Sequence, residues 1–416
     1  MIKIGIIGVG TVGEAVVKNL KKNKEIIKAR AGKEIKVVKG VVRDLNKKRD
    51  INIPLTTDYK EVTQDPEIDI VVELMGGVES AYKVVKDALI HKKAVVTANK
   101  ALLAYHRFEL QKLASTPFGY EASVAGGIPI IKALRDGLSA NDIIEIKGII
   151  NGTCNYILSE MKKGRDYQEV LKEAQKLGYA EANPTFDVGG YDAAHKLLIL
   201  ASIAYNIDAK PEDILIEGIE NINLMDIEFA KEFGYEIKLL GIAKKIDNKI
   251  ELRVHPTLIK KEEMIAKVDG VMNAVSVIGD TVGETMYYGP GAGGDATASA
   301  VISDIIEIAR GIKAPMLGFK LPLNKNYKLK EIDEIESKYY LRIATKDKVG
   351  VLNKITNVLA KHNISIETFL QKPKDNFAKL LFSTHKCKEK EIKKAIKEIE
   401  AFDFVLKPIN YIRIEE

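Results

Sequence analysis

The N-terminal segment limits what this chain can fold into more than any other stretch. An apolar run, Ile2–Ile7, leads directly into the glycine pattern GVGTVG at residues 8–13, and helical periodicity follows. A strand that ends in a glycine-rich turn and continues as a helix is typical of dinucleotide-binding α/β domains. In such a turn Gly8 reverses the chain, Gly10 lets backbone N–H groups approach a pyrophosphate, and Gly13 permits close packing of the helix. We therefore expect a doubly wound parallel sheet at the start of the chain.

The first turn of the following helix is the expected phosphate site. Backbone N–H groups at Thr11 and Val12 would lack partners within the helix, and the helix dipole favours negative charge there. The pattern favours nucleotide binding because strand, turn and helix occur in the required order. A tight turn in some other doubly wound domain, without a nucleotide, is the alternative.

The second apolar segment, 34–42, bears on the choice of cofactor because it ends at Arg43 and Asp44. An acidic side chain in this region binds the ribose hydroxyls of NAD, whereas an arginine binds the 2′-phosphate of NADP. Arg43 comes first, so the sequence favours NADP and leaves NAD open. An exposed surface ion pair is the structural alternative.

Two more strand–helix repeats support a parallel sheet covered on both faces. Apolar residues 68–74 precede a helical pattern at 79–92, and residues 94–100 precede another at 101–114. Ligands bind beyond the carboxyl ends of such strands. The residues expected at this crevice are Gly76, Thr97, Asn99 and Lys100. A merely exposed lysine is the alternative interpretation of the last of these.

Composition excludes several classes of protein. The 416 residues suffice for two or three domains, and 64 basic against 58 acidic residues give a net charge of only +6. Because these charges are spread along the chain, they describe an ordinary surface and not a nucleic-acid patch. No apolar run reaches about 18 residues and no signal-peptide pattern begins the chain, so we expect no membrane segment. Two distant cysteines, Cys154 and Cys387, favour a reducing cytoplasm.

The segment 174–196 collects a group of chemically reactive side chains. Glu181, Asp187, Asp192 and Lys196 are separated there mainly by small residues, and apolar helix-forming sequence follows. Asp192 and Lys196 are four residues apart, so they share one helix face. The resulting polar pocket would suit an amino acid's ammonium group and the movement of a proton. A capped helix start with an ordinary exposed ion pair is the alternative.

This segment, written A-x3-G-Y-A-x2-N-P-x2-D-V-x-G-x-D-x3-K, resembles the signature of the homoserine dehydrogenases. Members of that family interconvert L-homoserine and L-aspartate 4-semialdehyde with NAD(P), in the biosynthesis of threonine, methionine and isoleucine. The stretches TANK at 97–100, GIINGTCNYIL at 148–158 and GPGAGGDAT at 289–297 also resemble that family. The resemblance implies an NAD(P)-dependent oxidoreductase.

The resemblance and the chemistry of the side chains together assign roles in the site. Lys196, assisted by Lys100 and Asp192, is expected to act as the acid/base, its pKa lowered toward neutrality by burial beside the second cation. Lys100 would also contact cofactor and substrate. Glu181 and Asp192 would hold the substrate ammonium group, and Asp187 would orient that group or support Lys196. Further residues implied are Gly178 and Gly293 at the cofactor, and Asn151, Gly152 and Thr153 lining a pocket between domains.

Residues 119–138 resemble the family's binding segment for a monovalent cation, Na⁺ or K⁺. The carboxylate of Glu121 and the carbonyls of Val124, Gly126 and Ile128 occupy the matching positions. Oxygen donors with one carboxylate suit a hard, weakly charged ion. Without the resemblance, this stretch indicates only a glycine turn before a helix.

The remainder of the chain predicts two further regions. Residues 235–288 indicate a mostly antiparallel sheet for substrate and dimer contacts. After a polar linker at 319–338, residues 339–416 follow the order strand, helix, strand, strand, helix, strand of a ferredoxin-like module. The motif DKVG at 347–350 resembles the ACT domain, an amino-acid-sensing module, with threonine as the expected effector. A structural, dimer-holding role is the alternative.

The predicted organisation is α/β with three folded domains. A Rossmann-type domain spans 1–135 and is completed by about 290–318, an α+β catalytic and dimerisation domain spans 136–289, and the ACT domain follows the linker. Removal of the ACT domain before Ser337 is expected to leave a folded enzyme that no longer responds to the effector. We expect a homodimer or higher homo-oligomer. Another small-amino-acid dehydrogenase, or a non-catalytic sensor of NADP and amino acids, is the alternative function.

Overall fold

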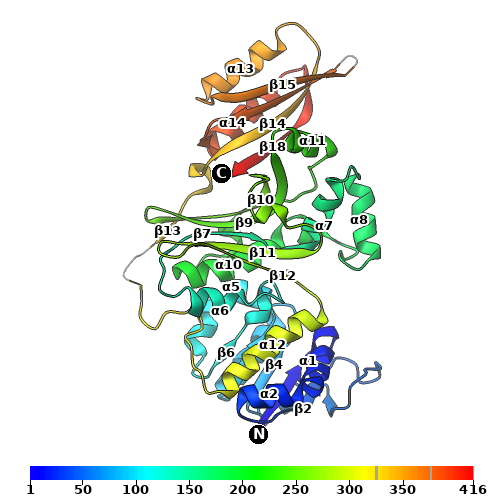
Figure 1. Ribbon diagram of the computed structural model, residues 1–416, viewed down its shortest axis with the longest axis vertical. Coiled ribbons are helices and arrows are strands. Elements are labelled where there is room, and N and C mark those ends of the chain that lie inside the picture. Colours follow the sequence, from blue (N-terminus) through cyan, green and yellow to red (C-terminus); the bar gives the residue numbers. More distant parts are fainter. Residues whose placement is uncertain (324–326, 375–376, 416) are drawn as a thin grey trace. The chain divides into compact units, whose positions relative to one another are not determined.

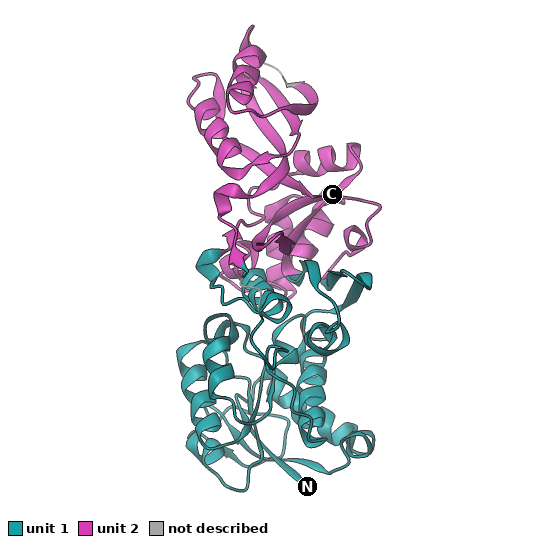
Figure 2. Ribbon diagram, turned by 90° about the vertical axis from the view of Figure 1, so that its left-hand side faces the viewer, with its two compact units in different colours: residues 1–152, 192–213, 272–327 teal, residues 153–191, 214–271, 328–416 magenta. Residues whose placement is uncertain are grey.

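The computed structural model describes residues 1–323, 327–374 and 377–415. The chain divides into two compact units, which are described separately (Figure 2). Unit 1 comprises residues 1–152, 192–213 and 272–327, and unit 2 comprises residues 153–191, 214–271 and 328–416. Within the described ranges, no helix has the length and apolar character needed to cross a membrane.

Unit 1 contains a six-stranded sheet in which every pairing is parallel. Its strands are β1 (Ile2–Ile7), β2 (Ile35–Val41), β3 (Leu55–Thr56), β4 (Ile70–Glu73), β5 (Ala94–Thr97) and β6 (Phe118–Gly119). They lie in the order β3-β2-β1-β4-β5-β6, which reverses direction at β1. The strands β4 and β5 are buried along their whole length, as their continuous apolar sequence predicts for a sheet covered on both faces. The expected Rossmann-type domain is confirmed.

Helices cover both faces of this sheet. The connections from β1 to β2 and from β4 to β5 run in opposite directions across the sheet, so right-handed crossovers place their helices on opposite sides. These helices are α1 (Thr11–Lys22), α2 (Lys24–Ala31), α3 (Lys60–Thr63), α4 (Glu79–Ile90) and α5 (Lys100–Leu113). A helix from much later in the chain, α12 (Gly294–Ala309), packs against α1 and α2 (Figure 1). The nucleotide-binding fold is therefore discontinuous in sequence.

Unit 1 also contains an antiparallel group of strands and a buried helix. The strands are β7 (Ile143–Ile149), β11 (Met272–Gly279) and β12 (Gly283–Pro290), with β11 paired to both neighbours. The helix α10 (Tyr191–Tyr205) is apolar around most of its circumference, and most of its residues are buried for that reason. Short elements in this unit are η1 (Glu121–Ser123), α6 (Ile130–Lys132), η2 (Ala133–Gly137) and η3 (Pro211–Asp213).

Unit 2 is organised around a long antiparallel hairpin. Its strands β9 (Tyr235–Ile246) and β10 (Lys249–Lys260) pair along their full length. The helices of this part are α7 (Gly152–Met161), α8 (Tyr167–Lys176), α9 (Thr185–Val188) and α11 (Leu224–Glu232). The short elements are β8 (Leu215–Ile216), η4 (Ile265–Lys267), β13 (Lys328–Leu329) and η5 (Ile332–Glu334). The prediction of a mostly antiparallel sheet over residues 235–288 is confirmed by this hairpin and by the pairing of β11 with β12, while β8 and β13 pair with β10 in parallel.

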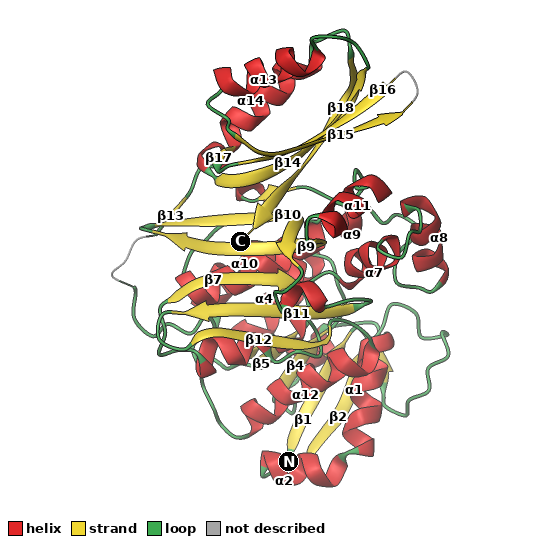
Figure 3. Cartoon of the chain, turned by 45° about the horizontal axis from the view of Figure 1, so that its top comes forward, coloured by secondary structure: helices red, strands yellow, loops and turns green. Residues whose placement is uncertain are grey.

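The C-terminal module of unit 2 has the predicted ferredoxin-like order (Figure 3). Its elements are β14 (Glu336–Lys346), α13 (Val351–Lys361), β15 (Ile366–Lys374), β16 (Phe377–Thr384), β17 (Cys387–Lys388), α14 (Glu389–Glu400) and β18 (Val405–Glu415). Apolar faces of α13 and α14 form one core with the strands. The last strand, β18, pairs with β14 on one side and in parallel with β10 on the other. The module is thus joined to the hairpin by a shared sheet within unit 2.

Candidate active site

The glycine turn after β1 has the close contacts that its sequence pattern predicts. Gly8 adopts a φ of 100°, and a Cβ on it would lie 2.6 Å from the carbonyl oxygen of Leu74. A Cβ on Gly13 would lie 2.7 Å from the carbonyl oxygen of Gly8, so α1 packs directly on the turn. Gly10 has nothing within 4 Å of such a Cβ. Packing therefore requires glycine at positions 8 and 13, and open space lies beside Gly10, next to the start of α1 at Thr11.

A cavity of about 530 Å³ adjoins this turn within unit 1. Three basic side chains, Arg43, Lys47 and Arg49, lie along its lining. Arg49 is held in place because its Nε donates to the carbonyl of Val9 at 2.9 Å and its Nη1 donates to the carbonyl of Asp44 at 3.0 Å. Lys47 and Arg49 were not predicted; the run of basic residues at 47–49 was the available signal.

The ends of β4 and β5 are fixed by a buried carboxylate. Glu73 accepts a hydrogen bond from Thr97 Oγ1 at 2.6 Å and from the backbone N–H of Met75 at 2.8 Å. Burial raises the pKa of Glu73, and this effect outweighs that of the hydrogen bonds, which act to lower the pKa. Asn99 donates from Nδ2 to the carbonyl of Gly77 at 2.7 Å, which ties the loop after β4 to the start of α5. The sequence placed Asn99 and Thr97 at this edge and missed Glu73.

Two lysines share one buried carboxylate at the start of α10. Lys100, the first residue of α5, lies 2.5 Å from Oδ1 of Asp192, and Lys196 lies 2.7 Å from Oδ2. Lys196 also donates to the carbonyl of Ile150 at 2.7 Å, and Asn151 Nδ2 donates to Asp192 Oδ2 at 2.9 Å. The structure therefore brings together Lys100, Asp192, Lys196 and Asn151, all of which the sequence singled out. We call Lys100, Asp192 and Lys196 the lysine–aspartate centre.

The electrostatics of this centre favour an ionised Asp192. Burial acts to raise the pKa of Asp192, but the ammonium groups of Lys196 and Lys100 outweigh it and lower that pKa overall. The Lys100 side chain is 36% exposed, whereas that of Lys196 is 11% exposed. The centre thus has a buried lysine at its base and a more accessible lysine at its edge.

His195 borders this centre and was not predicted. It is buried, and its ring makes an edge contact with the ring of Tyr105 at a centroid distance of 5.6 Å. Burial lowers the pKa of His195, although the charge of Asp192 acts in the opposite direction. A neutral imidazole beside the lysine–aspartate centre adds no further positive charge to it.

The other expected substrate and cofactor residues of the signature belong to unit 2. Glu181 is exposed, and Asp187 is half-buried on α9. The carbonyl of Asp187 accepts a hydrogen bond from Cys154 Sγ at 3.2 Å. Gly178 adopts a φ of 77° just after α8. Gly293, by contrast, belongs to unit 1 and is the N-cap of α12 with a φ of 108°.

The expected cation segment forms a buried turn in unit 1. Glu121 is 2% exposed, and its two carboxylate oxygens accept backbone N–H groups of Ile131 and Lys132 at 2.8 and 3.0 Å. Burial, with Asp304 nearby, raises the pKa of Glu121 to about 7. The residues whose carbonyls were expected to assist, Val124, Gly126 and Ile128, are buried in the same turn. Across the described ranges, no group of three or more His, Cys, Asp or Glu side chains is arranged to hold a metal ion.

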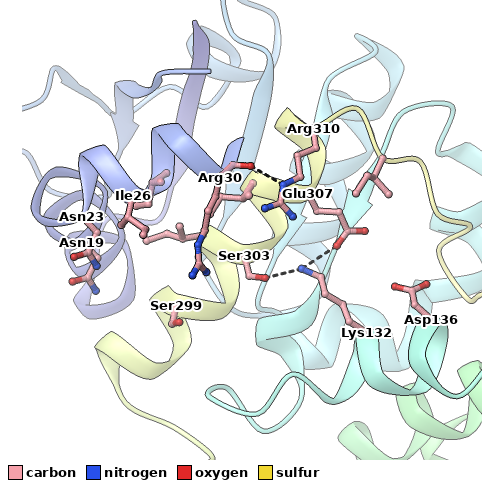
Figure 4. Close-up of a pocket in the computed structure, with 14 residues that line it drawn as sticks. Asn19, Asn23, Ile26, Arg30, Lys132, Asp136, Ser299, Ser303, Glu307 and Arg310 are labelled. Carbon is pink, nitrogen blue, oxygen red and sulfur yellow. Dashed lines mark hydrogen bonds and ion pairs between the residues drawn. The ribbon is translucent and has the colours of Figure 1, made fainter. Parts of the chain in front are cut away.

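Another cavity in unit 1, of about 630 Å³, lies between α1, α2 and α12 (Figure 4). Lys132 reaches across it to Ser303 Oγ at 2.8 Å, and Arg310 Nε donates to the carbonyl of Arg30 at 2.7 Å. None of the residues of the lysine–aspartate centre lines this cavity. Lys132 also pairs with Glu307 at 2.9 Å. Because the cavity does not adjoin the lysine–aspartate centre, it is not the candidate site.

Family comparisons agree with this division of the chain. The family models described as "Homoserine dehydrogenase, NAD binding domain", "Homoserine dehydrogenase" and "ACT domain" match residues 8–117, 129–306 and 339–404. The homoserine dehydrogenase of Helicobacter pylori is 58% identical over 418 aligned residues, covering 100% of this chain and 99% of that protein. That of Pseudomonas aeruginosa is 46% identical, with coverage of 100% and 99%.

Solved structures give the same result. A homoserine dehydrogenase crystal structure from Thiobacillus denitrificans superposes with a TM-score of 0.93 at 47% identity, covering 100% of this chain and 98% of that one. A hyperthermophilic archaeal homoserine dehydrogenase in complex with NADPH superposes with a TM-score of 0.65 at 26% identity, covering 76% and 99%.

Proposed function

This chain belongs to the homoserine dehydrogenase family, and from that premise we propose which of its residues bind the reactants and move the proton. It is an NAD(P)-dependent oxidoreductase that interconverts L-homoserine and L-aspartate 4-semialdehyde. The alternatives of a different small-amino-acid dehydrogenase and of a non-catalytic sensor are not retained, because relatives named for this activity match the whole chain.

We propose that Lys196 is the acid/base of the reaction. The observation that carries this assignment is the lysine–aspartate centre, in which Asp192 holds Lys196 and Lys100 at 2.7 and 2.5 Å. When bound, the nicotinamide supplies the hydride chemistry at the carbon that bears the hydroxyl group. Lys196 would take the proton from the hydroxyl oxygen of homoserine during oxidation and return it during reduction. Lys100, the more exposed cation, would contact substrate and cofactor.

Recognition of the substrate ammonium group is assigned to carboxylates of the signature. Both oxygens of Asp192 already contact the two lysines or Asn151. Its main contribution would therefore be to orient the two lysines. Glu181 and Asp187 would therefore supply most of the negative charge that binds the ammonium group. Replacing either carboxylate by its amide and measuring the KM for homoserine tests this assignment.

The residues around the glycine turn fit NADP. Gly10 leaves room for a pyrophosphate at the N-terminus of α1, while Gly8 and Gly13 allow the close packing of the turn. Arg43 and Lys47, in the adjoining cavity, would bind the 2′-phosphate. The archaeal relative bound to NADPH supports the same preference, while NAD stays compatible with Asp44. Comparing kcat/KM for NADP and NAD tests this proposed preference.

A monovalent cation, Na⁺ or K⁺, is proposed for the turn at Glu121. The donor set is one buried carboxylate with the backbone carbonyls of Val124, Gly126 and Ile128, which suits such an ion. These residues would stabilise the turn that leads into α6. Activity measured in sodium, potassium and choline chloride at equal ionic strength tests this proposal, since indifference to the cation would contradict it.

We further propose that the ACT module binds an amino-acid effector, threonine in the first instance, and that the enzyme is a cytoplasmic homodimer. The ACT family match supports the effector. Titrating the activity with threonine tests the effector, and light scattering of the purified chain tests the homodimer.

The most informative single experiment for the proposed function is a spectrophotometric assay of NADP reduction with L-homoserine. The expected result is turnover that requires the four-carbon amino alcohol. Equal turnover with serine or other small hydroxy amino acids would contradict the proposed site.

A further inference from the structure

Arg413 on β18 joins three parts of unit 2 through a fully buried guanidinium group. Its Nη1 and Nη2 donate to the two carboxylate oxygens of Glu217 at 2.7 and 2.9 Å. Its Nε donates to Glu389, at the start of α14, at 3.0 Å. The side chain of Arg413 is 0% exposed, whereas that of Glu217 is 29% exposed. Paired, planar contacts of this kind fix geometry as well as charge.

The loop that carries Glu217 is packed on the backbone of the signature segment. The N–H of Ile219 donates to the carbonyl of Val188 at 2.9 Å. A Cβ on Gly218 would lie 2.3 Å from that same carbonyl oxygen, so only glycine allows this approach. On its other side, Glu217 is anchored because its N–H donates to the carbonyl of Val254 at 2.8 Å. The loop therefore has little freedom to move independently of Val188.

Val188 directly follows Asp187 on the short helix α9. A displacement of the loop at Glu217 would thus be passed to the residue proposed to bind the substrate ammonium group. We propose that Arg413, through Glu217, is a positioning residue for the substrate-binding segment, so that the last strand of the ACT module supports substrate binding through the Glu217 loop. This inference rests on the proposed role of Asp187 and concerns a residue far from it in sequence.

The tests use Glu217, because Arg413 is fully buried and its removal would leave Glu389 without its main partner. Glu217→Gln keeps the shape of the side chain and removes the charge that holds Arg413. Since a small misplacement of a binding group has a large effect on substrate, we expect the KM for homoserine to rise about tenfold while the KM for NADP is unchanged. Arg413→Lys keeps the charge but loses the planar guanidinium group. Its KM for homoserine should lie between those of the wild type and Glu217→Gln.

A matched control is available on the same module. Arg342 of β14 donates to the buried carboxylate of Asp226 on α11 at 2.8 Å. This ion pair also joins the ACT module to the rest of unit 2, but Tyr340, Asn410 and Asn223, which also contact Asp226, lie outside the signature segment. Arg342→Gln should lower the thermal unfolding temperature and leave the KM for homoserine unchanged.

The outcomes separate this inference from the function on which it rests. A normal KM in Glu217→Gln, or an equal rise in Arg342→Gln, would overturn the positioning role. Asp187→Asn, measured alongside, reports on the proposed function alone, since a normal KM in that variant would remove Asp187 from substrate binding. If Glu217→Gln raises the KM while Asp187→Asn does not, the positioning role stands, with another residue of the segment as its target.

Discussion

At the scale of single residues, the carboxylate of Asp192 determines how the two lysines of the lysine–aspartate centre are held. It lies 2.5 Å from Lys100 and 2.7 Å from Lys196, and it is buried. Because opposite charges attract more strongly away from water, Asp192 offsets the repulsion between the two cations and fixes their separation. Effects of substitutions at the three positions should therefore not be additive, since each residue depends on the other two.

Lys196→Ala is predicted to lower kcat by about 10²–10⁴-fold, the usual contribution of a general acid or base. Cofactor affinity should stay close to that of the wild type, because the glycine turn is untouched. Steady-state kinetics with homoserine and NADP give the first quantity, and fluorescence titration of NADPH gives the second. Lys163→Ala, at a lysine with 68% exposure, is the control and should behave as wild type. Near-normal turnover in Lys196→Ala would remove this residue from the mechanism.

Arg43→Glu is predicted to weaken NADP more than NAD. A carboxylate at this exposed position would repel the 2′-phosphate and could accept hydrogen bonds from ribose hydroxyls. The ratio of kcat/KM for the two cofactors should shift toward NAD by about tenfold or more, a change of at least 1.4 kcal/mol. Lys48→Glu, a neighbouring charge reversal, controls for the general effect of negative charge. An unchanged ratio would show that Arg43 does not contact the cofactor.

The sequence predicted the residues that are related by helical spacing or that follow the carboxyl end of a parallel strand. Asp192 and Lys196 are four residues apart on one helix, and Lys100 follows a parallel strand, so all three residues were predictable. Glu73 and His195 were missed because nothing local distinguishes a carboxylate or an imidazole that becomes buried. Their environment depends on chain segments far away in sequence.

At the scale of elements, the repeating strand–helix pattern predicted the parallel sheet, and alternating strands predicted the ferredoxin-like module. The pairing of β18 with β10 was not predictable in the same way. It joins Thr257 to Arg413 across a long stretch of chain, and no short-range pattern encodes that register. At this junction Arg413 of β18 pairs with Glu217 and Glu389, and Arg253 of β10 lies 3.2 Å from Glu415 of β18.

The strand β10 carries a buried histidine that links stability to pH. His255 is 0% exposed, and burial, with Arg413 and Arg253 nearby, lowers its pKa well below the usual 6.5. The folded protein therefore keeps His255 neutral, while the unfolded chain binds a proton below about pH 6.5. The stability from this group is complete above that pH and falls by about 1.4 kcal/mol per unit as the pH drops further.

We predict that His255→Gln reduces the loss of unfolding free energy between pH 7 and pH 5. Urea unfolding at pH 7 and pH 5 measures this loss of free energy. His91→Gln, a substitution of an exposed histidine, is the control. The same pH dependence in wild type and His255→Gln would contradict the assignment.

At the scale of the whole molecule, the ACT module shares a sheet and several buried ion pairs with the rest of unit 2. Asp226 is 0% exposed and is satisfied by Tyr340, Arg342 and Asn410 of the module. These contacts oppose the expectation that removal before Ser337 leaves a folded enzyme. The ACT pattern was recognisable in sequence, but its attachment was not, because the residues that form it are dispersed.

We therefore predict that truncation before Ser337 destabilises the protein instead of producing an active, unresponsive enzyme. Asp226 and Glu217 would lose their partners in the module, and β10 would lose its pairing with β18 and gain an unpaired edge. Calorimetry and activity of the truncated chain check this. Cooperative unfolding near the wild-type temperature with full activity would show that the module is independent.

The position of β18 also bears on how the protein is made. The strand β18 lies between β10 and β14, both of which leave the ribosome before it. Because domains otherwise fold from the N-terminus onward during synthesis, one edge of β10 must stay unpaired along residues 257–259 until β18 has been synthesised. A nascent chain that stalls before β18 would thus expose that edge, and chaperone binding should fall once β18 has emerged and paired.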